Sequence, residues 1–212
     1  MQSMLTRRPF AAAIVLSILL ATLGGCTATD RRDARVQYDL GHPTAAGAAP
    51  APGAEKMPPV AIGEISAPSW MDSSRMVYRL EYDNPLEANT YANARWTMSP
   101  SKLLLQRIKS RISEAGGAVL GPGDGGPSVR QLRIEADDFS QVFTAPGVSI
   151  ARVILRVSVL QDRKLVAQRT FVGSAPAPAP NAAGGAQALA RASDILIADM
   201  LAWLSALPPR VP

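Results

Sequence analysis

The chain has 212 residues, of which 22 are basic, 17 are acidic, one is histidine and one is cysteine. A lone cysteine excludes a disulfide within the chain, and this length suffices for one domain whose core is stabilised by burial alone. Arg7 and Arg8 account for two of the 22 basic residues, which leaves 20 against 17 acidic ones, an excess too small and dispersed to indicate nucleic-acid binding.

The first 25 residues are typical of a secretory signal peptide. A short basic head, Arg7 and Arg8, precedes an apolar run from Phe10 to Leu23. A transmembrane helix needs about 20 predominantly apolar residues, so the run is short for a span and fits the apolar region of a leader. An uncleaved membrane anchor is the alternative interpretation.

The only cysteine, Cys26, follows this run directly. The residues "LGGC" (23–26) resemble a bacterial lipoprotein box, which has an aliphatic residue and two small residues before a cysteine. The resemblance implies diacylglycerol on the Cys26 sulfur and cleavage just before it, and two or more acyl chains anchor a protein stably. An incidental cysteine is the alternative. Thr27, where aspartate would favour inner-membrane retention, favours the periplasmic face of the outer membrane, with the inner membrane as the alternative.

The residues after Cys26 predict a flexible stalk (26–35) and then one domain (36–207). Its first elements, in chain order, are a short strand at 36–41, a Pro/Ala/Gly-rich loop at 42–59, an interior strand at 60–65, an alternating strand at 75–82 and a turn at 83–85. Ser99 is the expected N-cap of a helix with Pro100 at its first position, and the glycines at 116 and 117 end it. The buried stripe of this helix is expected to be Leu104, Leu105, Ile108 and Ile112.

The second half of the chain predicts a clearer strand pattern. Apolar residues alternate with charged ones at 131–137 and again at 149–160, and a four-residue turn at 161–164 joins the latter to the next strand. A second Pro/Ala/Gly-rich loop is expected at Ser174–Ala186. A long helix follows, whose buried face contains Leu189, Ile195 or Leu196, Met200 and Leu204.

Candidate chemical sites are weak. His42 is the sole histidine and lies in a Pro-rich segment, so neither a hydrolase triad nor a zinc site is expected. "GPGDGG" (121–126) is followed by a strand instead of a helix and is interpreted as a glycine turn. Asp137 and Asp138 are expected to point to opposite faces of a strand that bends as its apolar phase shifts to Phe139. Five arginines, for which a lipid-phosphate patch is the alternative, are expected to form salt bridges on the solvated face: Arg130, Arg133, Arg152, Arg156 and Arg169.

Several motifs in order resemble the ABC-type transport auxiliary lipoprotein family. After the lipoprotein box come "YDLG" with Tyr38 and Leu40, then a Pro-x-Trp-Met-Asp turn with Trp70. The most recognisable is a Tyr-x-x-x-Arg-Trp-x-x-x-Pro pattern that enters a helix, and its residues are Tyr91, Arg95, Trp96 and Pro100. "DMLAWL" (199–204) resembles the family's C-terminal helix. These motif residues are expected to serve packing, the default for Tyr91 and Trp96, or docking.

What the resemblance implies is an α/β fold: a single domain with a mixed β-sheet, antiparallel hairpins and two main flanking helices, with α+β as the alternative. The implied function is that of a non-enzymatic component of an ABC transporter, without catalytic residues, metal or cofactor. Its implied partners are an MCE-domain (mammalian cell entry) protein, a permease and an ATPase that move phospholipid or other hydrophobic molecules across the periplasm. Self-association stays open. A stand-alone lipid-binding module or an envelope enzyme is the alternative function.

Overall fold

The computed structural model describes residues 35–42, 57–124, 126 and 129–208, and residues 35–212 form one compact unit. The predicted signal peptide (1–25), Cys26, the stalk up to residue 34 and most of the first predicted loop (43–56) lie outside the described residues.

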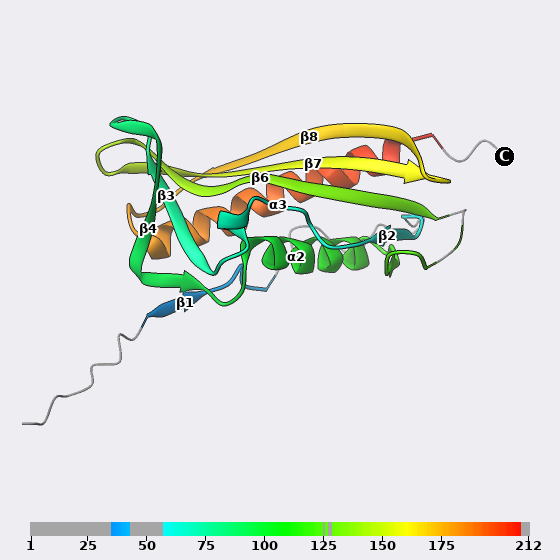
Figure 1. The fold of residues 1–212 in the computed structure, drawn as a ribbon, viewed down its shortest axis with the longest axis horizontal. Coiled ribbons are helices and arrows are strands. Elements are labelled where there is room, and N and C mark those ends of the chain that lie inside the picture. The colour runs from blue at the N-terminus through cyan, green and yellow to red at the C-terminus, as the bar shows by residue number, and fades with distance from the viewer. Residues whose placement is uncertain (1–34, 43–56, 125, 127–128, 209–212) are drawn as a thin grey trace, which may run out of the picture. The chain divides into compact units, whose positions relative to one another are not determined.

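The described part of the chain is one mixed sheet with two long helices, as expected for an α/β fold (Figure 1). The strands are β1 (Val36–Tyr38), β2 (Val60–Ile62), β3 (Arg75–Leu80), β4 (Asn84–Trp96), β5 (Val119–Leu120), β6 (Arg130–Ala145), β7 (Val148–Gln161) and β8 (Lys164–Pro176). The helices are α2 (Pro100–Glu114), α3 (Ala182–Ala206) and a short 3-10 turn, η1 (Ser69–Met71).

Strand β6 organises the sheet. Along one edge it pairs over its length with β7, which pairs with β8. Along the other edge its first residues pair in parallel with β2, and its later residues pair in parallel with β3. Strands β5 and β4–β1 continue the sheet beyond β2 and β3 respectively. A single strand therefore joins two groups of strands that do not pair with each other.

The β6–β7–β8 antiparallel unit has one buried and one solvated face, as the alternation predicts. The buried face of β7 consists of five residues with no exposed surface, Ala151, Val153, Leu155, Val157 and Val159. Asp162 and Arg163 form the tight turn into β8, both with positive φ (50° and 62°), which is the backbone of the turns that match strand twist. The predicted hairpin is confirmed.

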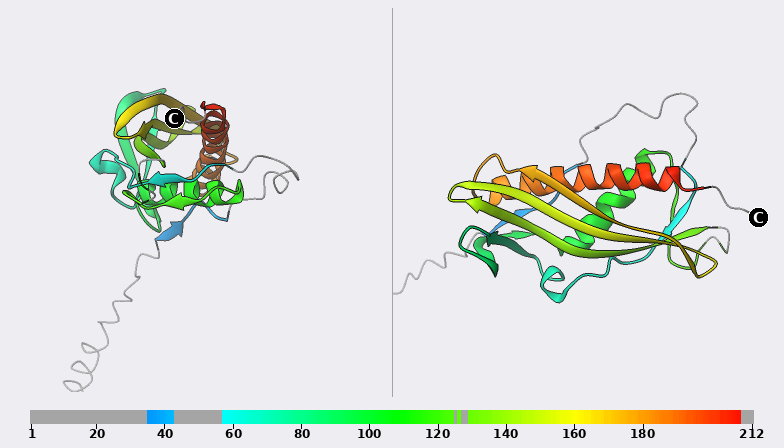
Figure 2. Two further views of the ribbon diagram at one scale, coloured as in Figure 1. Left: turned by 90° about the vertical axis from the view of Figure 1, so that its right-hand side faces the viewer. Right: turned by 90° about the horizontal axis from the view of Figure 1, so that it is seen from above.

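Both long helices cover the buried face, and the sheet curves around them (Figure 2). The core between them contains Trp96, Phe139, Ile108 and Leu196, each at most 1% exposed. Helix α3 packs along β7 and β8, where Gly173 lets the helix backbone approach. A Cβ on Gly173 would collide with the main-chain carbonyl of Ala192.

The second Pro/Ala/Gly-rich segment, Ser174–Ala186, is not the predicted loop. Its first three residues continue β8, and its last five form the first turn of α3. The Asn181 side chain caps that helix by accepting a hydrogen bond from the Gly184 N–H. Small residues bury well where a helix lies close to a sheet, and Ala175, Gly184, Gly185 and Ala186 are all buried. Only 177–181 connect the two elements.

Smaller corrections concern helix faces and turns. Leu103 is buried where Leu105 was expected, and Leu196 is buried while Ile195 is 47% exposed. The turn expected at 83–85 lies at 81–83, and Pro85 belongs to β4. Ser99 is the N-cap residue of α2, but its hydroxyl bonds to that of Ser101 and not to the helix backbone.

The Asp137–Asp138 bend is confirmed as a bulge. Ala136 pairs with Leu155 and Asp138 with Ile154, so residue 137 is the extra one. Contrary to the expectation of opposite faces, the bulge places both carboxylates on the solvated face, where Arg156 contacts Asp137 and Arg152 contacts Asp138. Arg152 also pairs with Glu81, and Arg156 with Glu135. The expected salt-bridged face is therefore present for these two arginines.

Candidate functional site

Five of the seven motif residues meet where β1, β4 and α2 join. Tyr38 of β1 pairs in register with Trp96 of β4, and the residue before it pairs with Arg95. The Thr97 N–H then donates to the Tyr38 carbonyl, 2.8 Å away, which fixes the turn into α2 at Pro100. Leu40 follows β1 and is 6% exposed. The motif that is scattered in sequence is thus one structural junction.

Trp96 is the centre of this junction and is 1% exposed. Its ring stands edge-on against that of Phe139, with centroids 5.4 Å apart, a favoured arrangement for two aromatic rings. Its backbone N–H donates to the Ser74 carbonyl at 2.8 Å. Trp96 therefore lies within the hydrophobic core.

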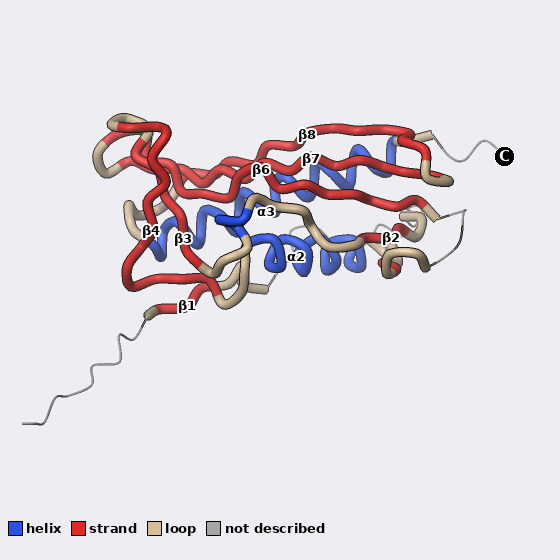
Figure 3. The backbone as a smooth tube through the Cα atoms, in the orientation of Figure 1, coloured by secondary structure: helices blue, strands red, loops and turns tan. Residues whose placement is uncertain are grey.

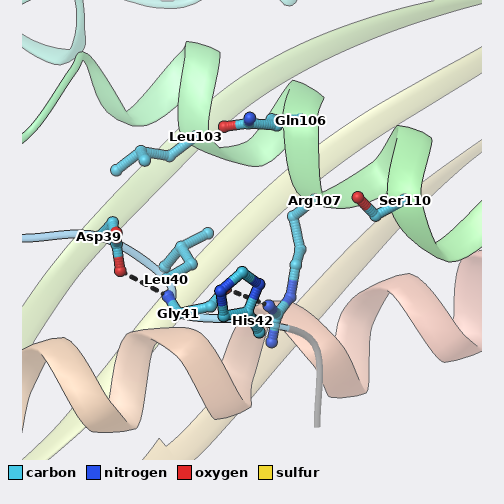
Figure 4. Close-up of a pocket in the computed structure, with 8 residues that line it drawn as sticks. All are labelled: Asp39, Leu40, Gly41, His42, Leu103, Gln106, Arg107 and Ser110. Atoms are coloured by element: carbon cyan, nitrogen blue, oxygen red, sulfur yellow. Dashed lines mark hydrogen bonds between the residues drawn. The ribbon is translucent and has the colours of Figure 1, made fainter. Parts of the chain in front are cut away.

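A cavity of about 280 Å³ opens beside the junction (Figure 4). The chain after β1 forms one wall, and α2 forms the other. The eight lining residues are Asp39, Leu40, Gly41, His42, Leu103, Gln106, Arg107 and Ser110. Five of these side chains are polar and two are aliphatic, and polar and apolar atoms share the lining about equally, unlike the mostly hydrophobic lining of typical small-molecule pockets.

Arg107 holds the walls of this cavity together. Its Nη1 donates to the Gly41 carbonyl at 2.8 Å. Its Nε and Nη2 donate to the two carboxylate oxygens of Asp194 on α3, at 2.8 and 2.6 Å. The Arg107 side chain is 4% exposed and that of Asp194 is 20% exposed. One guanidinium therefore links the chain after β1, α2 and α3.

Arg111, one helical turn beyond Arg107, shares the same carboxylate. It pairs with Asp194 at 2.9 Å and with Glu114 at 2.9 Å. Burial lowers the pKa of the Arg111 guanidinium, but the hydrogen bonds to Asp194 and Glu114 raise it by more, so the net shift is upward. Arg111 therefore stays charged at physiological pH.

Tyr91 and Trp70, the other two motif residues, do not line the cavity. The Tyr91 hydroxyl donates to Oε1 of Gln141 at 2.9 Å, and Nε2 of Gln141 donates to the Ser149 hydroxyl at 2.8 Å. Gln141 itself has no exposed surface. Burial, with a smaller contribution from the neighbouring Tyr78, raises the pKa of Tyr91 to about 12. Trp70 lies in η1. The guanidinium carbon of Arg79 lies over the Trp70 ring, 5.9 Å from the ring centroid.

Asp39, the carboxylate that lines the cavity near His42, has a structural partner in the backbone. The Asp39 carboxylate accepts from the Gly41 N–H at 2.7 Å, so it turns the backbone there instead of orienting an imidazole.

Arg107 and Asp194 were not singled out from the sequence, because each interrupts an apolar helical stripe as an ordinary charged residue would. The signal available was that Arg107 and Arg111 are spaced i, i+4 on the buried side of α2.

None of the helices in the described part of the chain combines the length and the apolar character needed to span a bilayer.

Comparison with known proteins defines the relationship. The chain is similar in structure to a Xanthomonas campestris protein of the DUF330 family, with 22% identity, a TM-score of 0.62, and coverage of 73% of this chain and 88% of the other. An uncharacterised protein of known structure has 12% identity, a TM-score of 0.53, and coverage of 69% and 92%. These likenesses show the fold alone, and no curated protein matches. The model of the ABC-type transport auxiliary lipoprotein component matches residues 38–201. The chain therefore belongs to the family of ABC-type transport auxiliary lipoprotein components.

Proposed function

We propose that the protein is a lipid-anchored, non-enzymatic auxiliary component of an ABC transport system of the MCE type. In this proposal Cys26 carries the lipid and holds the domain at the periplasmic face of the outer membrane. The domain works with an MCE-domain protein, a permease and an ATPase that move phospholipid or other hydrophobic molecules. The family match over residues 38–201, preceded by the "LGGC" sequence, is the observation that carries the proposal.

The structure supports a role in assembly more than one in chemistry. The motif residues at the junction are packed and bonded into the fold, as Trp96 and Leu40 illustrate. The polar groups of Arg107 and Asp194 are used to fasten three elements together. Side chains committed to such structural bonds are not available to activate a substrate, since a catalytic base must reach the proton it removes.

The alternative function is binding of a lipid by the domain itself, and the cavity beside α2 is the observation that favours it. Its volume of about 280 Å³ lies just below the roughly 300–1,000 Å³ of typical small-molecule pockets. A whole diacyl lipid does not fit this volume, so the alternative requires binding of a single headgroup or one acyl chain segment.

The proposal is tested in cells that produce the tagged full-length chain. Mass spectrometry of the purified protein is expected to show Cys26 as the N-terminal residue with attached acyl groups, and Cys26→Ala is the matched control. An unmodified cysteine refutes the anchor. Crosslinking in intact cells, followed by identification of captured proteins, is expected to recover an MCE-domain protein. Capture of unrelated envelope proteins only contradicts the transport assignment.

The lipid-binding alternative has a separate test. Native mass spectrometry of the full-length protein, released from mild detergent, reports non-covalent ligands in addition to the covalent acyl groups. A retained phospholipid that disappears in a variant filling the cavity, Ser110→Trp, favours direct binding. Absence of any retained lipid removes that alternative and leaves the assembly role.

A further inference from the structure

The open edge of β8 supports an inference that goes beyond these proposed roles. Among the described strands, β8 pairs with β7 alone and forms the margin of the sheet (Figure 3). It is 13 residues long. Long edge strands invite pairing with another chain, and proteins normally protect them with charges, prolines or bulges.

The protection of β8 is confined to its ends. Lys164 starts the strand and Pro176 ends it. The register shift lies near Leu165, among the first residues that pair with β7. Between Ala167 and Ala175 the only charged residue is Arg169, and its guanidinium lies 5.0 Å from the ring centroid of Phe171 in the same strand. Val172 is 58% exposed. The middle of the edge therefore carries no obstacle to strand addition.

The pairing with β7 shows which backbone groups face the open edge. The Ala177 N–H donates to the Ser149 carbonyl, so these residues form a hydrogen-bonded pair. Such pairs alternate along an antiparallel ladder. From Ala167 to Pro176 the odd-numbered residues of β8 therefore face β7, and the even-numbered ones face outward. Those outward-facing residues, all exposed, are Gln168, Thr170, Val172 and Ser174.

We propose that β8 pairs antiparallel with β8 of a second copy of this chain, about a two-fold axis at Thr170. Residue Thr170 is the midpoint of Lys164–Pro176, so this register is centred on the strand. Gln168 of each copy then meets Val172 of the other, and the three central pairs exchange about six backbone hydrogen bonds. Two-fold pairing of one surface with itself is the commonest symmetry of soluble oligomers.

Charge favours this register over its neighbours. With the axis at Thr170, Arg169 lies opposite Phe171 of the other copy and not opposite its own counterpart. An axis one residue earlier places the two Arg169 side chains directly opposite each other, which is unfavourable. An axis at Val172 places Pro176, which has no N–H, opposite an outward-facing residue and removes a bond. The strand is self-complementary in one register.

Disulfide trapping tests the register in the full-length protein in mild detergent. Directly opposed residues in a sheet lie within the Cα separation that a disulfide spans, roughly 4.4–6.8 Å. Thr170→Cys is expected to give a covalent dimer under mild oxidation. Gln168→Cys is the matched control, because two copies of residue 168 lie four residues apart along the ladder, about 13 Å. Equal trapping of both variants, or a Thr170→Cys crosslink to a different protein, overturns the proposal.

Charge substitution tests the same contact without a covalent bond. Light scattering is expected to report a protein mass of two chains for the native sequence. Thr170→Lys is expected to report one, because the two introduced ammonium groups face each other. Mixing Thr170→Lys with Thr170→Glu is expected to restore the dimer. A cooperative thermal melt shows that the lysine variant is folded, since Thr170 is exposed. A native monomer, or a dimer that persists in the lysine variant, overturns the proposal and leaves the transport role untouched.

Discussion

Replacement of Arg107 by methionine is the most informative single perturbation of this fold. Methionine keeps much of the stem volume of arginine but removes the guanidinium. The change deletes the two bonds to Asp194 and the bond to the Gly41 carbonyl. It therefore separates the contribution of the polar link from that of the packing around α2.

The magnitude follows from burial. Breaking a buried pair by removing one partner costs about 3–5 kcal/mol, and the Arg107 side chain is 4% exposed. Asp194 keeps its contact with Arg111, and the variant no longer has to desolvate a guanidinium. Both effects place the cost at the low end, about 3 kcal/mol, which is a large share of the roughly 5–15 kcal/mol that stabilises a domain.

Urea unfolding followed by circular dichroism measures this cost. Arg111→Met is the matched control, because Arg111 pairs with the half-exposed Glu114 as well as with Asp194, and it is expected to lose about 1 kcal/mol. A double-mutant cycle with Asp194→Asn is expected to show that the losses at Arg107 and Asp194 are not additive. A loss below 1 kcal/mol for Arg107→Met, or one no greater than for Arg111→Met, refutes the assigned role.

The remaining predictions concern packing and alkaline pH. Gly173→Ala is expected to lower the melting temperature strongly, since its Cβ meets the α3 backbone, while Gly63→Ala, whose Cβ has only an ordinary contact at 3.8 Å, is expected to change it little. Leu196→Ala is expected to cost about 2–5 kcal/mol, whereas Ile195→Ala, at a position 47% exposed, is expected to cost under about 1 kcal/mol; equal losses contradict the buried face. The folded pKa of Tyr91, raised to about 12, means that its stabilising contribution is complete below pH 10 and is lost as pH rises toward 12. Tyr91→Phe is expected to flatten that part of a denaturation curve, and identical curves contradict the assignment.

The strands that alternate regularly could be predicted from the sequence. In β7 the inward residues from Ala151 to Val159 are all apolar, so local pattern and tertiary structure agree. The bulge at Asp137–Asp138 could also be predicted, because the apolar phase shifts there. Trp96 could be placed at the start of α2 from Pro100 and the stripe that follows.

What the sequence does not reveal depends on contacts between distant residues. The Pro/Ala-rich segment before α3 has the composition of a loop, and its order comes from the close approach of α3 to β8 that Gly173 permits. The choice between Ile195 and Leu196 depends on which side of α3 faces the sheet, and Leu196 is the residue that lies against Gly173 of β8. The Arg107–Asp194 link joins residues 87 positions apart, and no local pattern marks such a pair.

The position of β6 between two groups of strands has a consequence for insertions and deletions. Because side chains alternate between faces, a shift of one residue turns a strand inside out. Deleting Asp137 removes the extra residue of the bulge and leaves Ala136 opposite Leu155 and Asp138 opposite Ile154 in an unbroken ladder, so the side chains on either side keep their faces. Phe139 stays against Trp96, and the residues of β6 that pair with β2 and with β3 keep their orientation. The bulge is therefore a point at which β6 can lose one residue without inverting either half of the sheet.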